Sequence, residues 1–248
     1  MKKLLLFFIL LSSLLHASTI NIALAANVSY AIEDLVDTFH NSYPDTQVNI
    51  TLGSSGKLTT QIKYGAPYDL FLSANMAYPF VLYKENLTLT KPRVYAKGTL
   101  ILLSHKNRDF TQGLNIIENP EIKSIAIANP RTAPYGIATK ELLLNTKQYK
   151  KIQHKLVFGE SVSQTVAYTA RSTDIGFIAK SALFSKQMQG FTQGKNWIDL
   201  DTSLYTPIEQ GVVLLKHAQA NKDAKAFYDF LFTQDAKEIF RKYGYIVK

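Results

Sequence analysis

Cysteine is absent from the 248-residue sequence, which excludes disulfide bonds, thiolate metal ligands and a cysteine nucleophile. Histidine is also scarce, and we expect no structural zinc site because no two histidines stand close together at ligand spacing. The five are His16, His40, His105, His154 and His217. Charged residues make up only 19% of the chain and apolar residues 46%, which is ordinary globular usage and excludes disordered and fibrous architectures.

Long hydrophobic runs are also missing, apart from one at the N-terminus. Residues 4–15 are apolar except for Ser12 and Ser13, and they follow two lysines. A membrane-spanning helix needs about 20 apolar residues, so this run is too short to span comfortably. The basic start, the short apolar run and the small residue Ala17 predict a secretory signal over residues 1–17, with an uncleaved anchor as the alternative. No cysteine follows for lipid attachment, so we expect an exported, soluble protein.

Positive charge predominates, with 28 Lys and Arg against 19 Asp and Glu and a formal net charge of +9. Nucleic-acid binding is one reason for such an excess, because phosphate contacts come from Lys and Arg. The predicted secretory signal argues against it, and no recognised nucleic-acid motif is present. Two readings stay open: a solvated basic face, or long-range steering of a small anion.

Strand-like and helix-like segments alternate along the chain. Aliphatic runs of strand length occur at 20–26, 48–52, 69–73, 100–104, 125–128, 155–158, 175–179 and 212–215. Segments with helical spacing of apolar residues occur at 32–39, 58–64, 137–145, 162–170, 222–232 and 234–243. This alternation of aliphatic strands and helices predicts an α/β fold with parallel strands rather than a sandwich or a helical bundle.

Four of the predicted strand-to-helix joints carry polar or tightly turning residues. They are Asn27, Gly-Ser-Ser-Gly at 53–56, the two-proline loop 129–136, and residues 159–164, where Ser161 and Gln164 have capping-box spacing. In a parallel sheet such joints lie at the carboxyl ends of the strands, where α/β proteins bind ligands. Each helix start offers unpaired N–H groups and a positive dipole end. Ordinary capping explains any one joint alone, but four at one crevice could surround a small oxyanion with donors.

A different class of function is suggested by one short motif. Ser54-Ser55-Gly56-Lys57 matches Ser-x-x-Lys, the nucleophile signature of penicillin-recognising enzymes. The companion motifs Ser-Asp-Asn and Lys-Thr-Gly are both absent. A secreted serine hydrolase using Ser54 and Lys57 is therefore the weaker alternative.

One longer stretch resembles a known family. Residues 65–75, Gly-Ala-Pro-Tyr-Asp-Leu-Phe-Leu-Ser-Ala-Asn, closely resemble a signature of the periplasmic molybdate-binding proteins, the ModA family. The segments 129–141, 174–177 and 226–245 are similar to the same family. The resemblance covers about residues 20–248.

The resemblance implies a two-lobed periplasmic-binding-protein fold of type II, α/β in class. Each lobe would be a mixed, mostly parallel sheet flanked by helices, with the ligand in the inter-lobe cleft. One lobe would hold residues 18–97 plus 209–248, and the other 98–208. The implied function is capture of molybdate or tungstate and delivery to a membrane ABC permease, with another oxyanion such as sulfate as the alternative. We expect a periplasmic monomer that is not an enzyme, needs no cofactor and holds molybdenum or tungsten only as the bound oxyanion.

The resemblance also implies which residues contact the oxyanion. Carried over by position, the contacts fall at Asn27, Ser55, Tyr135, Val162 and Ala179. Ser55 would supply a hydroxyl and an amide, whereas Tyr135 and Val162 would act through their backbone N–H groups.

Two of these positions depart from the family's usual residues. Asn27 replaces a serine, and its side-chain NH₂ is expected to donate in place of the hydroxyl. Ala179 stands where a tyrosine hydroxyl is common, so one hydrogen bond must be lost or replaced. A bond to a charged group contributes roughly 1.5–3 kcal/mol, or about tenfold to a hundredfold in affinity. Candidate replacement donors are Ser54, Thr132, Ser163 and the side chain of Tyr135.

A site made only of neutral donors still discriminates among anions. Sulfate and molybdate are both fully ionised near neutral pH, so cavity size must separate them. Phosphate carries a proton that needs an acceptor, and leaving it unpaired is costly. Molybdate and tungstate are nearly equal in size, so both are expected to bind.

Overall fold

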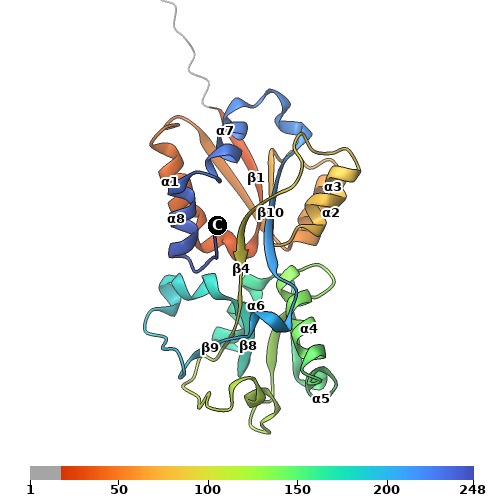
Figure 1. Cartoon of the computed structure of the whole chain (residues 1–248), viewed down its shortest axis with the longest axis vertical. Coiled ribbons are helices and arrows are strands. Elements are labelled where there is room, and N and C mark those ends of the chain that lie inside the picture. Colours follow the sequence, from red (N-terminus) through yellow and green to blue (C-terminus); the bar gives the residue numbers. More distant parts are fainter. Residues whose placement is uncertain (1–17) are drawn as a thin grey trace, which may run out of the picture.

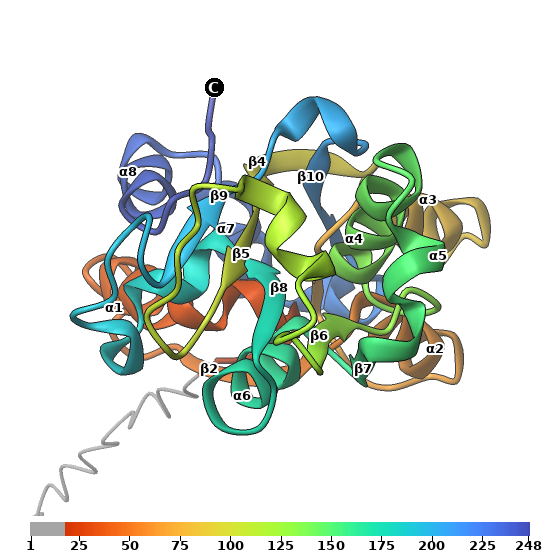
Figure 2. The ribbon, with the colours of Figure 1, turned by 90° about the horizontal axis from the view of Figure 1, so that it is seen from below.

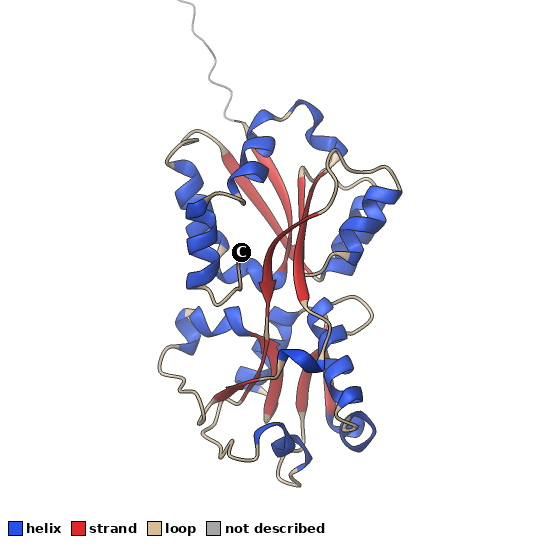
Figure 3. Cartoon of the chain, viewed as in Figure 1, coloured by secondary structure: helices blue, strands red, loops and turns tan. Residues whose placement is uncertain are grey.

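The computed structural model describes residues 18–248, and the predicted signal at 1–17 lies outside the described residues. Two lobes are stacked along the long axis of the molecule, each built on a central sheet with helices packed around it (Figures 1 and 3). The expected two-lobed α/β architecture is confirmed. Within residues 18–248, no helix has both the length and the apolar character needed to span a membrane.

The first lobe, at the top of Figure 1, contains a five-stranded sheet in the order β2-β1-β3-β10-β4. Its strands are β1 (Thr19–Ala25), β2 (Gln47–Gly53), β3 (Leu70–Ser73), β4 (Arg93–Gly98) and β10 (Ile208–Leu214). Helices α1 and α8 lie on one side of this sheet and α2 and α3 on the other. The helices are α1 (Ile32–His40), α2 (Ser55–Lys63), α3 (Ala77–Lys84), α7 (Lys222–Phe230) and α8 (Gln234–Lys242).

The second lobe repeats this plan with the order β7-β6-β8-β5-β9. Its strands are β5 (Leu100–Leu103), β6 (Ile125–Ala128), β7 (Leu156–Gly159), β8 (Ile175–Ala179) and β9 (Trp197–Asp199). Its α-helices are α4 (Pro134–Asn145), α5 (Tyr149–Ile152) and α6 (Val162–Arg171). Seen end-on in Figure 2, α4 and α6 lie on different sides of β6.

The sheets are mixed, as expected, but antiparallel pairings are as frequent as parallel ones in residues 18–248. β1 is parallel to β2 and β3, and β6 is parallel to β7 and β8. β10 runs antiparallel to β3 and β4, and β5 runs antiparallel to β8 and β9. The antiparallel strands are those that enter or leave a lobe: β4 leads into β5 with only Thr99 between them, and β9 leads back to β10.

Local sequence explains the first helix. Ile32, Leu35 and Phe39 are buried on one face of α1, as their spacing predicts. Glu33 stands in the first turn and His40 in the last, where acidic and basic groups complement the helix dipole. The Phe39 ring meets Phe227 of α7 edge to face at 5.0 Å between centroids, which joins α1 to the core of the first lobe.

Residues 65–75, which carry the family resemblance, include β3 and help to hold the first sheet together. The side chain of Asp69 is only 2% exposed, just before β3. Its carboxylate accepts a hydrogen bond from the Asn21 N–H of β1 at 2.8 Å and lies 2.9 Å from His217 Nδ1. A buried carboxylate needs such partners. Asp69 therefore joins β1 and the short helix at Lys216–Ala220 to β3.

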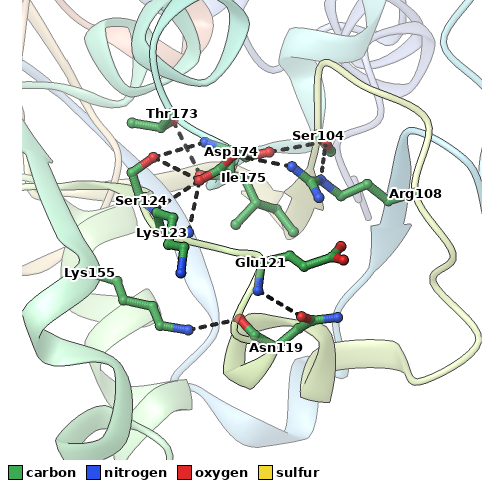
Figure 4. A network of polar contacts seen from close by, with 10 residues as sticks. All are labelled: Ser104, Arg108, Asn119, Glu121, Lys123, Ser124, Lys155, Thr173, Asp174 and Ile175. Carbon is green, nitrogen blue, oxygen red and sulfur yellow. Dashed lines mark hydrogen bonds and ion pairs between the residues drawn. The ribbon is translucent and has the colours of Figure 1, made fainter.

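A second carboxylate organises the start of β8 (Figure 4). Asp174 accepts hydrogen bonds from the N–H groups of Lys123 and Ser124 at 2.9 and 3.0 Å and from the Ser124 hydroxyl. Arg108 Nη2 lies 3.3 Å from its other oxygen. Partial burial raises the pKa of Asp174, but these hydrogen bonds and the Arg108 charge outweigh burial and hold the pKa below its ordinary value of 3.8.

Replacing Asp174 should therefore destabilise the protein in a pH-dependent way. A lowered folded-state pKa stabilises the fold above the unfolded value, and the contribution is lost as pH falls through the folded value. We expect Asp174→Asn to lower the free energy of unfolding by about 1–3 kcal/mol at pH 7 and by much less at a pH well below the lowered folded-state pKa. Urea denaturation at both pH values measures the difference.

The matched control is Glu121→Gln, an exposed residue of Figure 4 whose backbone N–H, and not its carboxylate, takes part in the contacts drawn. This change should stay within about 0.5 kcal/mol of the wild type. Equal destabilisation of Asp174→Asn at both pH values would show that the charge is unimportant.

Candidate functional site

A small cavity lies where the two lobes meet, and no charged side chain lines it. The cavity is small, with about 10 Å³ open to the centre of a water-sized sphere. Its lining residues are Ala25, Ala26, Asn27, Gly53, Ser54, Ser55, Ala74, Ala133, Pro134, Tyr135 and Val162. All four of the strand-to-helix joints singled out in the sequence lie at or beside this lining.

The lining contains the first residues of four helical segments. These are α2, α4, α6 and the 3₁₀ turn Ala26–Tyr30, which follows β1 directly. The first N–H groups of a helix have no partner within it and carry the positive end of its dipole. The residues preceding three of these segments, Ala25, Ser54 and Ala133, make no side-chain capping bond. Uncapped N–H groups at a small buried cavity are suited to binding a small anion.

The fourth segment, α6, is capped as predicted. Ser161 accepts from the N–H of Gln164, and the Gln164 side chain accepts from the N–H of Glu160. The Ser161 cap uses the N–H of the third helical residue, whereas the Gln164 side chain bonds one residue before the cap instead of completing a capping box. The N–H of Val162, at the first helical position, remains available at the cavity.

Hydrogen bonds close the lobes on each other around the cavity. The Gly56 N–H of the first lobe donates to the Thr132 carbonyl of the second at 2.8 Å. In the other direction, the Ser163 hydroxyl donates to the Ala26 carbonyl at 2.8 Å and the Ser181 hydroxyl to that of Asn27 at 2.9 Å. The residues that line the cavity are buried, and electrostatic attraction is stronger in such surroundings than in bulk water.

The structure brings four of the five predicted contact residues to this cavity: Asn27, Ser55, Tyr135 and Val162. The hydroxyl oxygen of Ser55 accepts the Ala74 N–H at 2.9 Å, which leaves its hydrogen free to donate. Ala179 is fully buried at the end of β8, where it pairs with Leu100, and it is not among the lining residues.

In this structure the Asn27 NH₂ group, which we expect to donate to an anion, bonds within the protein. Both hydrogens are already used, one on Gln210 Oε1 at 2.8 Å and one on the Tyr245 hydroxyl at 2.9 Å. The Tyr245 hydroxyl in turn donates to the Asn27 carbonyl at 2.8 Å. The side chain of Asn27 therefore holds its own backbone in place, and its N–H at the start of the 3₁₀ turn is the group left at the cavity.

Tyr135 also uses its side chain for packing rather than for the cavity. The ring is buried, and burial raises the pKa of its hydroxyl well above the ordinary value. The hydroxyl sits against Gly98 at the end of β4, where any Cβ atom would collide with it. Glycine at 98 thus lets the strand that leaves the first lobe pass close to the start of α4.

Gln210 and Tyr245 are site residues that the sequence reasoning missed. They lie 183 and 218 positions from Asn27 along the chain, so no local spacing connects them. Tyr245 belongs to the C-terminal segment that resembles the family, but nothing in that resemblance marks its hydroxyl as a hydrogen-bonding group.

Comparison with known proteins agrees with this geometry. A family profile described as "Bacterial extracellular solute-binding protein" matches residues 20–246. The chain belongs to this family. It is also 34% identical over 228 residues to the molybdate-binding protein ModA of Rhodobacter capsulatus, covering 91% of this chain and 87% of that protein.

Two solved structures share the fold of this solute-binding protein. The periplasmic molybdate-binding protein of Azotobacter vinelandii superposes with a TM-score of 0.85 at 29% identity, covering 92% of this chain and 99% of that one. The sulfate-binding protein SubI of Mycobacterium tuberculosis H37Rv has a TM-score of 0.72 at 13% identity, over 92% of this chain and 86% of that one. The second likeness shows the fold alone.

The Tyr245 hydroxyl can be tested directly. Tyr245→Phe removes a group that pairs with both the side chain and the carbonyl of Asn27, and these buried groups lose their partner. We expect the free energy of unfolding to fall by about 1–3 kcal/mol, measured by urea denaturation. Tyr64→Phe, at an 88% exposed position, is the control and should change it by less than about 0.5 kcal/mol. Equal stability of the two variants would contradict the role given to Tyr245.

Proposed function

We propose that this protein captures a tetrahedral oxyanion, molybdate first and tungstate with it, between its lobes and delivers it to a membrane ABC permease. The observation that carries the proposal is the meeting of uncapped helix starts at one small, uncharged cavity. The identity to a molybdate-binding protein over nine-tenths of the chain supports the choice of anion.

The donors would be backbone N–H groups and one hydroxyl. Asn27, Tyr135 and Val162 would each offer a backbone N–H, and Ser55 its N–H and its hydroxyl hydrogen. No charged side chain lines the cavity, so the anion's charge would be balanced by helix dipoles and hydrogen bonds. We assign no contact to Ala179.

Delivery requires the cleft to open and close. We propose that residues 18–97 plus 209–248 and residues 98–208 move as two bodies about the crossings at Thr99 and between β9 and β10. The inter-lobe hydrogen bonds of Ser163 and Ser181 would then form only in the closed state. We further propose that the protein acts in the periplasm as a monomer, after removal of residues 1–17, and catalyses no reaction.

The hydrolase alternative gains no support from the residues that would carry it. In residues 18–248, the Ser54 hydroxyl has no hydrogen-bond partner, so no general base is positioned to activate it. The Lys57 ammonium lies 3.6 Å from Glu160 on the opposite lobe, and both side chains are about half exposed. Such a pair contributes little to stability and is consistent with a contact between closed lobes.

Thermal unfolding of residues 18–248 with four oxyanions tests the proposal. A ligand at 1,000 times its dissociation constant adds about 4 kcal/mol, which shifts the midpoint by roughly 8–16 °C at this size. We expect this shift with molybdate and with tungstate. Phosphate should give a smaller shift because the groups assigned to the anion are donors and leave its proton poorly paired, and sodium chloride of equal ionic strength is the control.

Two results would change the account. A shift with sulfate and none with molybdate would keep the oxyanion site and reassign the ligand. No shift with any of the four anions would remove the basis for an oxyanion transport protein.

A further inference from the structure

Ser54 is the one cavity-lining side chain whose buried hydroxyl has no hydrogen-bond partner in the described part of the chain. The residue is 4% exposed, and its hydroxyl oxygen is shielded from solvent. A buried hydroxyl without a partner costs free energy, so its presence calls for an explanation such as a ligand.

Its position makes the missing bond more informative. Ser54 is the residue preceding α2, with extended backbone angles of −68° and 147°, and serine there ordinarily accepts an N–H from the first turn. No such capping bond forms. The Gly56 N–H, one of the groups that a capping serine would accept, donates instead to the Thr132 carbonyl, so the Ser54 hydroxyl is left without that partner.

The other hydroxyls near the cavity already contact other parts of the protein or lie outside the cavity lining. Ser163 donates to the Ala26 carbonyl, and the Tyr135 hydroxyl sits against Gly98. Thr132 is half-buried but is not among the lining residues. Of the side chains that could replace the donor missing at Ala179, Ser54 alone both lines the cavity and lacks a partner.

We propose that the Ser54 hydroxyl donates a hydrogen bond directly to the bound oxyanion, as a second hydroxyl contact beside Ser55. This inference rests on the proposed function, since it assigns a further ligand-binding residue to that same site. The two serines differ in one respect that an experiment can use. Ser55 also accepts the buried Ala74 N–H, whereas Ser54 has no bond within the protein to lose.

Isothermal titration with sodium molybdate, together with ligand-free thermal unfolding, tests this on residues 18–248. We expect Ser54→Ala to raise the molybdate Kd by about tenfold to a hundredfold while leaving the ligand-free midpoint nearly unchanged. Ser54→Thr keeps the hydroxyl and should restore most of the affinity. Ser55→Ala should raise the molybdate Kd and also lower the midpoint of ligand-free thermal unfolding, because it leaves the Ala74 N–H without its hydrogen-bond partner.

The matched control is Ser185→Ala. Ser185 has a buried hydroxyl that likewise lacks a partner, but it lies in the second lobe and does not line the cavity. Its replacement should leave the molybdate Kd within about twofold of the wild type.

Each outcome separates this inference from the function it rests on. If wild-type protein binds no molybdate, the proposed function fails at its first step. If wild-type binds but Ser54→Ala binds equally well, Ser54 is not a contact. A loss of affinity accompanied by a fall in the ligand-free midpoint as large as that of Ser55→Ala would also overturn the assignment, because the hydroxyl would then serve the fold.

Discussion

The constraint on which this structure depends is the need of helix N–H groups for partners when they are buried between two lobes. The starts of α2 and α4 and of the turn at Ala26–Tyr30 lack side-chain caps, and they line a small cavity between the lobes. Polar groups in such a place are costly unless a ligand completes them. An anion satisfies the donors and the dipoles together, without any balancing cation from the protein.

The rest of the molecule positions these helix starts. Parallel strands β1, β2 and β6 end at the cleft, so the segments that follow them begin there. The antiparallel strands β10 and β5 let the chain cross between the lobes and return. Near the crossing, Gln210 of β10 and the C-terminal Tyr245 hold Asn27 in place, so the start of one donor segment is tied to a strand that carries the chain back from the second lobe.

Much of this arrangement could be predicted from sequence because it follows from local chemistry. Apolar periodicity predicted α1, which the structure confirms. Spacing predicted a capping box of Ser161 and Gln164, of which the Ser161 bond forms while Gln164 bonds the N–H of Glu160. The convergence of four joints was also predicted, because the carboxyl ends of parallel strands share one edge of a sheet. The strands β4 and β9 and helix α3 were missed; in β4 the residues Arg93–Gly98 have no continuous aliphatic run.

The details of the cavity could not be predicted because they depend on contacts far apart in sequence. Asn27 was expected to donate from its side chain, but Gln210 and Tyr245 take both hydrogens. Ala179 was carried over from a resemblance in position alone, and the fold leaves it outside the cavity lining. Sequence shows which residues could donate; only the structure shows which donors are already in use.

The most direct test is a crystal structure of residues 18–248 grown with molybdate, with the molybdenum located by its anomalous scattering. We expect one molybdenum atom in the inter-lobe cavity, with the anion's oxygens about 2.7–3.2 Å from backbone nitrogens at the starts of α2, α4 and α6. Molybdenum bound on the surface of one lobe, or at a cluster of lysines, would contradict it.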